Sequence, residues 1–199
     1  MRGVIQTSAF LKDRRTALVV IDLQRGILAR DVGPHTSSEV LANTVKIARA
    51  FRAASQPVVW VHVSYASHGG DMLKPLVDEA PPATSFSAGW DELVPELGIE
   101  QPDIVVTKRN WGAFYGTDLD LQLRRRDVTA IALCGIATNI GVESTARDAF
   151  ERNYKLLFVE DAMASMSAQE HEHSCARIFP RMGIVRSTSD VIDALRGSV

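Results

Sequence analysis

Short apolar segments alternate with amphipathic segments along almost the whole of this 199-residue chain. The first apolar segment runs from Ala17 to Leu23 and is interrupted only by Asp22. A strand that is apolar without alternation is typical of a parallel sheet with helices on both faces. The next segment, Ser37–Ala54, has the helical period instead, with one apolar face made by Val40, Leu41, Thr44, Ile47, Ala48 and Phe51. Such alternation predicts repeated βαβ units.

The same two patterns recur to the end of the chain. We expect strands at Ala17–Leu23, Pro57–Val63, Ile104–Thr107, Val128–Cys134, Lys155–Val159 and Gly183–Arg186. We expect helices at Ser37–Ala54, Leu119–Arg126, Asn139–Asn153, Ala168–Phe179 and Ser189–Leu195. These elements predict an α/β fold, a three-layer α/β/α sandwich, formed by one domain over residues 1–199.

Composition narrows the possible partners. The formal net charge of −2 gives no general attraction to nucleic acid, and the run Arg124-Arg125-Arg126 falls at the end of a predicted helix, where cations are favourable. No run approaches the ~20 apolar residues of a membrane span, and the first residues do not read as a signal peptide. Cys134 and Cys175 fall in apolar or helical segments and are expected to be core thiols. We therefore expect a cytoplasmic enzyme for a small molecule, with no nucleic-acid or membrane partner.

One long irregular segment interrupts the alternation. It runs from Tyr65 to Pro102, is rich in Pro, Gly and Ser, and has Pro81-Pro82 in its middle. Long irregular stretches inside a compact domain often cover a site or an oligomer interface, although simple surface decoration is the alternative. This one carries apolar side chains at Met72, Leu73, Leu76, Phe86 and Trp90. We expect them to be covered in a homo-oligomer, a dimer or larger.

Asp22 is the first candidate for chemistry. It lies at the end of an apolar strand, and the carboxyl ends of parallel strands are where open α/β sheets bind ligands. A carboxyl group that is partly desolvated there has a raised pKa, which suits it to carrying a proton. Gln24 lies on the same side of the chain and is a candidate substrate contact. The alternative is an aspartate that only caps the following turn.

Lys108 is the second candidate. It closes the third predicted strand and precedes Trp111-Gly112-Ala113-Phe114-Tyr115-Gly116. Trp111, Phe114 and Tyr115 are expected to line a substrate pocket, because aromatic side chains wall a pocket while glycines let backbone approach a ligand. Thr117 or Asp118 is expected to cap the next helix. The alternative for Lys108 itself is an ordinary solvated lysine.

The third candidate is the turn from Gly135 to Gly141. Thr138 or Asn139 is a natural N-cap, so the free N–H groups near Gly141 are expected to face the strand ends and bind an anion or oxyanion. Ala137, Thr138 and Ile140 are expected to contact substrate. A cysteine at position 141 would be an activated nucleophile, and glycine leaves only space. Other groups are poor substitutes: Ser144 and Thr145 lie deeper in the helix, and Cys134 lies in a strand.

Together these residues resemble the isochorismatase-like, or cysteine hydrolase, family. Its pattern is Asp after the first strand, Lys after the third, and Gly-x-x-Thr-x-x-Cys after the fourth. Asp22, Lys108 and the turn ending at Gly141 match it, with glycine in place of the cysteine. The run Thr145-Ala146-Arg147-Asp148-Ala149 also resembles the family, and the likeness is closest to its bacterial YecD-type branch, in which this glycine occurs. The resemblance implies a six-stranded parallel, Rossmann-like sheet of order 3-2-1-4-5-6 and a cis peptide bond in the turn, at Ile136–Ala137.

The resemblance also implies a reaction. In relatives without the thiol, the aspartate is thought to protonate an enol-ether carbon, and water captures the cation that forms. Asp22 would be the acid, Lys108 would hold its charge state, and the helix terminus at Gly141 would receive an anionic group of a small carboxylated or carbonyl metabolite. The alternative is an inactive relative that binds a small molecule or acts as a scaffold. Thiol-based amide hydrolysis is a third alternative, which Gly141 disfavours because glycine supplies no nucleophile.

No metal or other cofactor is expected. Nicotinamidases of the family hold a metal through an Asp-x-His pair beyond the second strand, and residues 61–71 contain no such pair. His62 alternates with valines in a strand and is expected to be a satisfied core or edge histidine. His68 lies in a Gly-rich loop, and His171 and His173 are expected on a solvated helix.

Overall fold

The structure is a computed structural model that describes residues 6–12, 14–78 and 86–197. Its centre is a six-stranded sheet of order β3-β2-β1-β4-β5-β6, in which all neighbouring strands are parallel. The strands are β1 Thr16–Ile21, β2 Val58–Val63, β3 Ile104–Lys108, β4 Ala130–Ile136, β5 Lys155–Ala164 and β6 Gly183–Arg186. The predicted fold class and strand order are confirmed.

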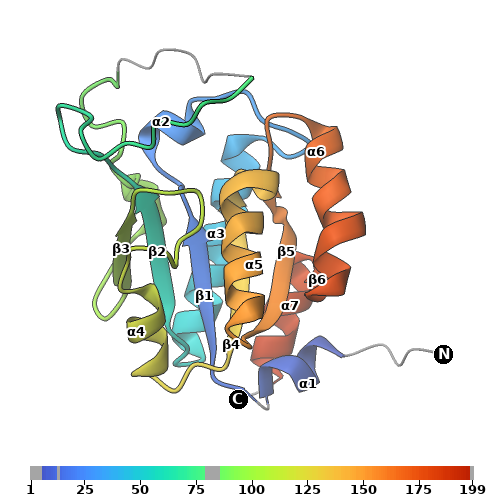
Figure 1. The fold of residues 1–199 in the computed structure, drawn as a ribbon. Helices are drawn as coiled ribbons and strands as arrows, with labels where there is room; N and C mark the ends of the chain where they lie inside the picture. The colour runs from blue at the N-terminus through green and yellow to red at the C-terminus, as the bar shows by residue number, and fades with distance from the viewer. Residues whose placement is uncertain (1–5, 13, 79–85, 198–199) are drawn as a thin grey trace.

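Helices cover both faces of this sheet. Figure 1 shows α3 and α7 behind it and α4, α5 and α6 in front. The helices are α1 Thr7–Lys12, α2 Arg25–Leu28, α3 Ser37–Ala53, α4 Leu119–Arg124, α5 Glu143–Glu151, α6 Ala168–His173 and α7 Thr188–Arg196, with shorter turns η1 Pro95–Leu97, η2 Thr138–Val142, η3 Ser174–Ile178 and η4 Phe179–Arg181. Within the described residues, no helix is long and apolar enough to cross a membrane.

Several elements differ from their predicted form. Helices α1 and α2 were not predicted, and the helix expected at Ala168–Phe179 passes from α6 into the π-helical turn η3. The helix expected at Asn139–Asn153 starts with one π-helical turn, η2, before it continues as α5. Strand β5 continues to Ala164, beyond the polar pair Glu160-Asp161 that made the sequence prediction end at Val159. The pairing of β5 with β4 shifts register between Leu133 and Gly135, so the strand passes through an irregularity that periodicity alone does not reveal.

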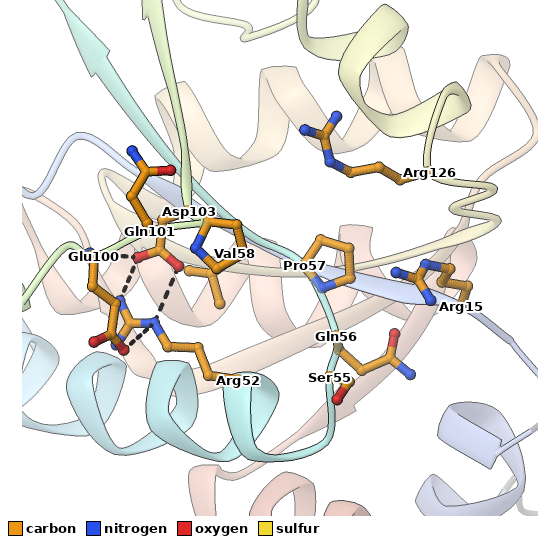
Figure 2. Close-up of a pocket in the computed structure, with 11 residues that line it drawn as sticks. Arg15, Arg52, Ser55, Gln56, Pro57, Val58, Glu100, Gln101, Asp103 and Arg126 are labelled. Atoms are coloured by element: carbon orange, nitrogen blue, oxygen red, sulfur yellow. Dashed lines mark hydrogen bonds and ion pairs between the residues drawn. The ribbon is translucent and has the colours of Figure 1, made fainter.

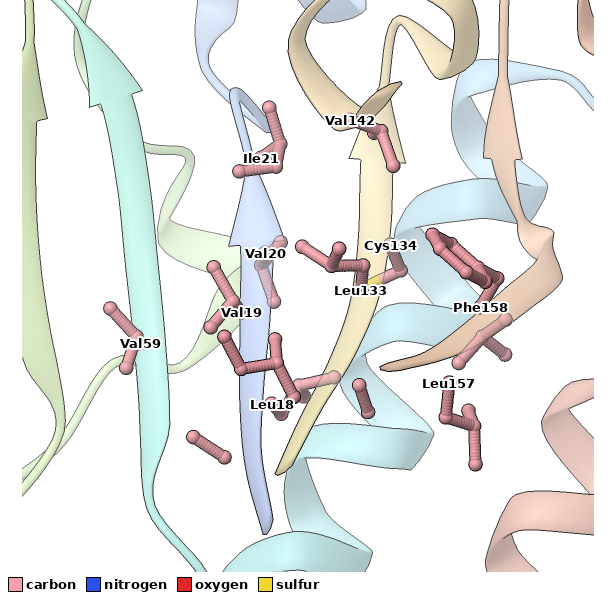
Figure 3. Packing of buried hydrophobic residues seen from close by; sticks show 14 of the residues in the cluster. Leu18, Val19, Val20, Ile21, Val59, Leu133, Cys134, Val142, Leu157 and Phe158 are labelled. Atoms are coloured by element: carbon pink, nitrogen blue, oxygen red, sulfur yellow. The ribbon is translucent and has the colours of Figure 1, made fainter. Parts of the chain in front are cut away.

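The core follows from the position of each strand in the sheet. All residues of β1 and β4 are buried, because helices cover both faces of these central strands. The edge strand β3 alternates buried and exposed residues instead. Figure 3 shows side chains of β1, β4 and β5 interlocking, among them Leu18, Leu133 and Phe158. Phe158 also stacks on Phe179, with ring centroids 4.0 Å apart.

Gly135 allows β1 and β4 to approach at their carboxyl ends. Its φ is +117°, and a Cβ atom there would lie 2.1 Å from the carbonyl oxygen of Ile21. Only glycine fits such a position. The strand order reverses at β1 and β4, so the close approach forms the kind of crevice in which α/β proteins bind ligands.

Candidate active site

Asp22 lies at this crevice, immediately after β1. Its backbone adopts the left-handed conformation, with φ 55°, which aspartate tolerates better than most residues. The backbone is held on both sides, because Asp22 N–H donates to Val61 and the Asp22 carbonyl accepts from Gln24. The residue is 6% exposed. The carboxyl group at this strand end is therefore largely removed from water.

Lys108 binds one oxygen of this carboxyl group. Its Nζ lies 2.8 Å from Asp22 Oδ2, and both side chains are almost completely buried. The other two protons of the ammonium group are donated to the carbonyls of Asn110, at 3.1 Å, and Trp111, at 2.9 Å. All three donors of the ammonium group are therefore used. Lys108 is not the solvated lysine of the alternative interpretation.

The second oxygen of Asp22 has a different environment. Oδ1 is buried and has no hydrogen-bond partner among the described residues. Burial raises the pKa of Asp22 above its usual value, and the neighbouring charge of Lys108 only partly opposes this rise. A buried acceptor without a partner is costly unless a ligand satisfies it. Oδ1 is therefore the atom of this carboxyl group that is available to accept or deliver a proton.

Gly141 lies beside this ion pair. A Cβ atom at Gly141 would lie 3.4 Å from Asp22 Oδ2 and 3.6 Å from Lys108 Nζ. Its closest contact would be the Ile21 side chain, at 2.9 Å, which would have to shift slightly. The three positions predicted from separate parts of the sequence thus lie together. Any side chain at position 141 would project onto both charged groups.

The turn before Gly141 differs from the prediction at its cap. The peptide bond Ile136–Ala137 is cis, as expected. The N-cap residue is Ala137, and no side chain caps the helical segment that starts at Thr138. The prediction that Thr138 or Asn139 is the N-cap is wrong, because both side chains bind other groups. Thr138 is bound by His171 and Asn139 by Ser165.

Gln24 braces the strand ends. Its Nε2 donates to the Val63 carbonyl at 3.0 Å, and its Oε1 accepts from Val63 N–H at 2.9 Å. Nε2 also reaches the carbonyl of Trp90, at 3.4 Å. These contacts use both the nitrogen and the oxygen of the Gln24 amide, which is completely buried. The structure thus places Gln24 under the site as a support rather than facing a substrate.

The aromatic loop after Lys108 divides into two parts. The side chains of Trp111 and Tyr115 are 65% and 75% exposed, whereas Phe114 is buried against Tyr154, at the far end of α5. The prediction that Phe114 lines the site is therefore wrong. The backbone of the loop is the part that reaches the site, through the carbonyls that bind Lys108. The exposed side chains of Trp111 and Tyr115 are therefore candidates only for the rim of the site.

Thr145 joins this loop to the Gly141 turn. Its hydroxyl donates to the Gly141 carbonyl at 2.7 Å and accepts from Ala113 N–H at 3.1 Å. A hydroxyl engaged in both ways is a structural link, in agreement with the prediction that Thr145 is no nucleophile. Cys134 is also unsuited, since burial raises the pKa of its thiol to about 12.

An aromatic cluster next to Asp22 was not predicted as part of the site. Tyr65, Phe86 and Trp90 stack on one another, with Phe86 and Trp90 ring centroids 4.0 Å apart. Burial raises the pKa of Tyr65 and the negative charge of Asp22 raises it further, so the two residues lie within electrostatic range. The sequence signal was present, since these residues belong to the irregular segment 65–102. Pro81-Pro82 of that segment lie outside the described residues.

Two histidines, His62 and His171, compare differently with the sequence prediction. His62 is satisfied, as expected: Nδ1–H donates to the Asp91 carbonyl and Nε2 accepts from Thr107, both at 2.8 Å. The prediction that His171 lies on a solvated helix face is wrong, because His171 is 5% exposed. Its neighbour His173 is exposed. In the part of the chain that the structure describes, no three His, Cys, Asp or Glu side chains form a group that could hold a metal.

A surface cavity of about 390 Å³ lies elsewhere (Figure 2). Its lining includes Arg15, Pro57 and Asp103, which stand at the amino ends of β1, β2 and β3. Asp22 and Lys108 stand at the carboxyl ends of β1 and β3. The cavity is therefore at the opposite end of the sheet and is not the candidate site.

Comparisons with known proteins agree with this geometry. Residues 16–190 match the Isochorismatase domain family. The isochorismatase family protein YecD of Escherichia coli O157:H7 is 49% identical over 185 residues, which cover 93% of this chain and 98% of YecD. The ureidoacrylate amidohydrolase RutB of Methylobacterium radiotolerans is 34% identical, over 90% of this chain and 79% of RutB. A crystal structure of an isochorismatase family protein from Burkholderia thailandensis superposes with a TM-score of 0.88 at 47% identity, over 92% of this chain and 96% of that one. The chain belongs to the isochorismatase family and is a hydrolase of that family.

Proposed function

We propose that this hydrolase acts on a small carboxylated or carbonyl metabolite by acid/base chemistry at Asp22, without a covalent intermediate on a thiol. One observation carries the proposal most. A side chain at Gly141 would touch both Asp22 and Lys108, yet the position holds only hydrogen. The space that a nucleophile would fill is left for a group of the substrate.

The two oxygens of Asp22 have separate roles in this mechanism. Oδ2 is held by Lys108, which fixes the plane of the carboxyl group. Oδ1 has no hydrogen-bond partner among the described residues and carries the proton. A raised pKa keeps part of the population protonated nearer neutral pH, as a general acid requires.

For an enol ether, the step balances as follows. Asp22 gives its proton to the terminal carbon of the C=C bond, and the electron pair on the ether oxygen forms an oxocarbenium ion. Water adds to that cation and loses a proton to the Asp22 carboxylate, which restores the acid. The resulting hemiketal breaks into a ketone and an alcohol. The helix terminus that begins at Thr138 faces an anionic group of the substrate with its N–H groups.

The remaining members of the site have supporting roles. Ala137, Thr138 and Ile140 of the turn line one side of the site, and the exposed side chains of Trp111 and Tyr115 form its rim. Tyr65, Phe86 and Trp90 cover the side next to Asp22. We assign Gln24 to the positioning of these groups through Val63 and Trp90.

A substrate screen tests this function. Small enol ethers and small amides are incubated with the wild-type protein, with Asp22→Asn and with Asp193→Asn, whose carboxylate is exposed on α7. We expect turnover of an enol ether that survives in Asp193→Asn and is lost in Asp22→Asn. Turnover of amides that iodoacetamide abolishes would contradict the mechanism. Tight binding of a compound without turnover would favour the alternative of an inactive binding protein.

We also propose a cytoplasmic homo-oligomer formed by the single domain 1–199. Leu73, Leu76 and Val77 are 61%, 105% and 48% exposed in the single chain. They lie close together in the irregular segment 65–102, and we expect that a second copy that buries them also contributes to the wall of the site. Sedimentation at micromolar concentration is expected to give a dimer or larger species, and a 21.8 kDa monomer would contradict this proposal.

A further inference from the structure

The helix terminus at the site differs from those of α3, α6 and α7 in how it is held. Helices α3, α6 and α7 each begin with a capping box, formed by Thr36 and Glu39, Ser167 and Glu170, and Ser187 and Asp190. In each, a side chain occupies an N–H group of the first turn. The helical segment that starts at Thr138 has Ala137 as its N-cap and no side-chain cap. Among the described residues, no capping side chain occupies its first N–H groups, and Ile140 N–H donates to the Ala137 carbonyl at 3.2 Å.

Tertiary hydrogen bonds hold this segment instead. His171 Nδ1 lies 2.9 Å from Thr138 Oγ1, and both residues are buried. Ser174 donates to Glu143 at 2.7 Å, and Ser165 donates to Asn139. All three partners of the turn come from the end of β5 and the α6–η3 region that follows it. The residues after β5 and in α6 and η3 therefore hold a helix terminus that has no local capping side chain.

His171 makes further contacts besides its hydrogen bond to Thr138. Its Nε2 faces Cys175 Sγ at 3.5 Å, and its ring meets His35 edge-on, with centroids 5.7 Å apart. Burial, together with the smaller effect of the neighbouring His35, lowers the pKa of His171 to about 4, so the ring is neutral at ordinary pH. A hydroxyl both donates and accepts, so the bond to Thr138 persists in either neutral tautomer.

We infer that His171 is a positioning residue: through Thr138 it holds the start of the helical segment so that the terminus faces the Asp22–Lys108 pair. This inference rests on the proposed function, in which that terminus receives an anionic group. A capping side chain would compete with the substrate for the same N–H groups. Holding Thr138 by its side chain fixes the turn and leaves these groups to the ligand.

A thiol at position 141 can report on this positioning without a known substrate. The reference is Gly141→Cys, whose thiol pKa is read from the pH dependence of its alkylation by iodoacetamide. Thr138→Val is then added, which keeps the shape of the side chain and removes the hydroxyl. The matched control is Thr138→Ser, which keeps the hydroxyl. His171→Gln removes the ring from the other side of the same hydrogen bond and replaces the valine variant if that variant does not fold.

We expect Thr138→Val and His171→Gln to raise the thiol pKa by about one unit, and thus to slow alkylation near neutral pH roughly tenfold. Thr138→Ser is expected to stay within about twofold of the reference. A valine variant that melts earlier but alkylates at the reference rate would overturn the inference, since the bond would then only stabilise the fold. If the reference thiol itself is no more reactive than Cys134 and Cys175, the site assignment fails first, and the inference fails with it.

Discussion

Two ion pairs, at opposite ends of the sheet, show how a buried aspartate beside a cation can have different roles. Arg52 and Asp103 form one pair at the amino ends of the strands, and Asp22 and Lys108 form the other at the carboxyl ends. The aspartate is almost completely buried in both pairs. The pairs differ in how fully the carboxylate oxygens are used.

Both carboxylate oxygens of Asp103 accept hydrogen bonds. Oδ1 accepts from Arg52 Nε at 3.1 Å, while Oδ2 accepts from Arg52, from Trp60 Nε1 at 2.8 Å and from Glu100 N–H at 3.3 Å. Burial opposes ionisation, but the hydrogen bonds of Arg52 and Trp60 outweigh it and lower the pKa of Asp103. Asp22 has one oxygen that no described residue binds, and the pKa of its carboxyl group is raised. Full satisfaction of the oxygens thus distinguishes a structural carboxylate from one that is available for proton transfer.

The largest expected effect concerns activity. On a substrate found in the screen, Asp22→Asn is expected to lower kcat by about 10³-fold, because the proton donor is lost. The same isosteric change at Asp103 is expected to leave kcat within about twofold, since its oxygens face only structural donors. Steady-state kinetics of both variants test the comparison. Equal losses in the two variants would show that activity follows stability and not the free oxygen of Asp22.

The next effect concerns the space at Gly141. In Gly141→Cys, the new thiol adjoins Lys108 and the helix terminus, with Asp22 as proton acceptor. We expect it to alkylate at least about 100-fold faster at neutral pH than Cys134 or Cys175, whose thiols burial holds at a pKa of about 12. Mass spectrometry of iodoacetamide-treated protein identifies the modified residue. Turnover of the native substrate is expected to be lost, and unchanged turnover with fast alkylation would remove Gly141 from the working site.

A third experiment addresses stability. Asp103→Asn is expected to lower the free energy of unfolding by about 2 kcal/mol, because the change weakens charged hydrogen bonds and leaves Arg52 without its main partner. Asp193→Asn, at an exposed position, is the control and is expected to change it by less than about 0.5 kcal/mol. Urea denaturation measures both. A loss at Asp103 no larger than at Asp193 would mean that the saturated pair does not stabilise the fold.

The smallest effect is the pH dependence of stability, which has opposite sign for the two carboxyl groups. Asp103 has a lowered pKa, so its contribution is present above the usual value of 3.8 and is lost as pH falls through its native pKa. Asp22 has a raised pKa, so its protonated form favours the folded state, and stability declines as pH rises from 3.8 through the native pKa. Unfolding free energies of wild type, Asp22→Asn and Asp103→Asn over a series of pH values separate the two. Parallel curves for the two variants would contradict the assigned directions.

Much of the fold could be predicted from the sequence because each signal is local. Unbroken apolar runs predict central strands, as at Val128–Cys134, and apolar periodicity predicts α3 almost to the residue. Asp22, Lys108 and Gly141 could be predicted because the carboxyl ends of parallel strands converge. Phe114 and His171 were predicted wrongly, because an aromatic ring or a histidine has the same sequence signal whether it faces a ligand, solvent or the core.

The sequence by itself determined which elements form, which strand ends carry Asp22 and Lys108, and that position 141 has no side chain. Only the tertiary structure decided that Lys108 donates its three protons to one carboxylate oxygen and two carbonyls, and that Asp22 Oδ1 lacks a partner in the part of the chain that is described. Only it showed that His171 holds Thr138 from another part of the chain. The physical reason is that hydrogen-bond saturation and desolvation depend on groups distant in sequence, and local patterns do not encode which of those groups meet.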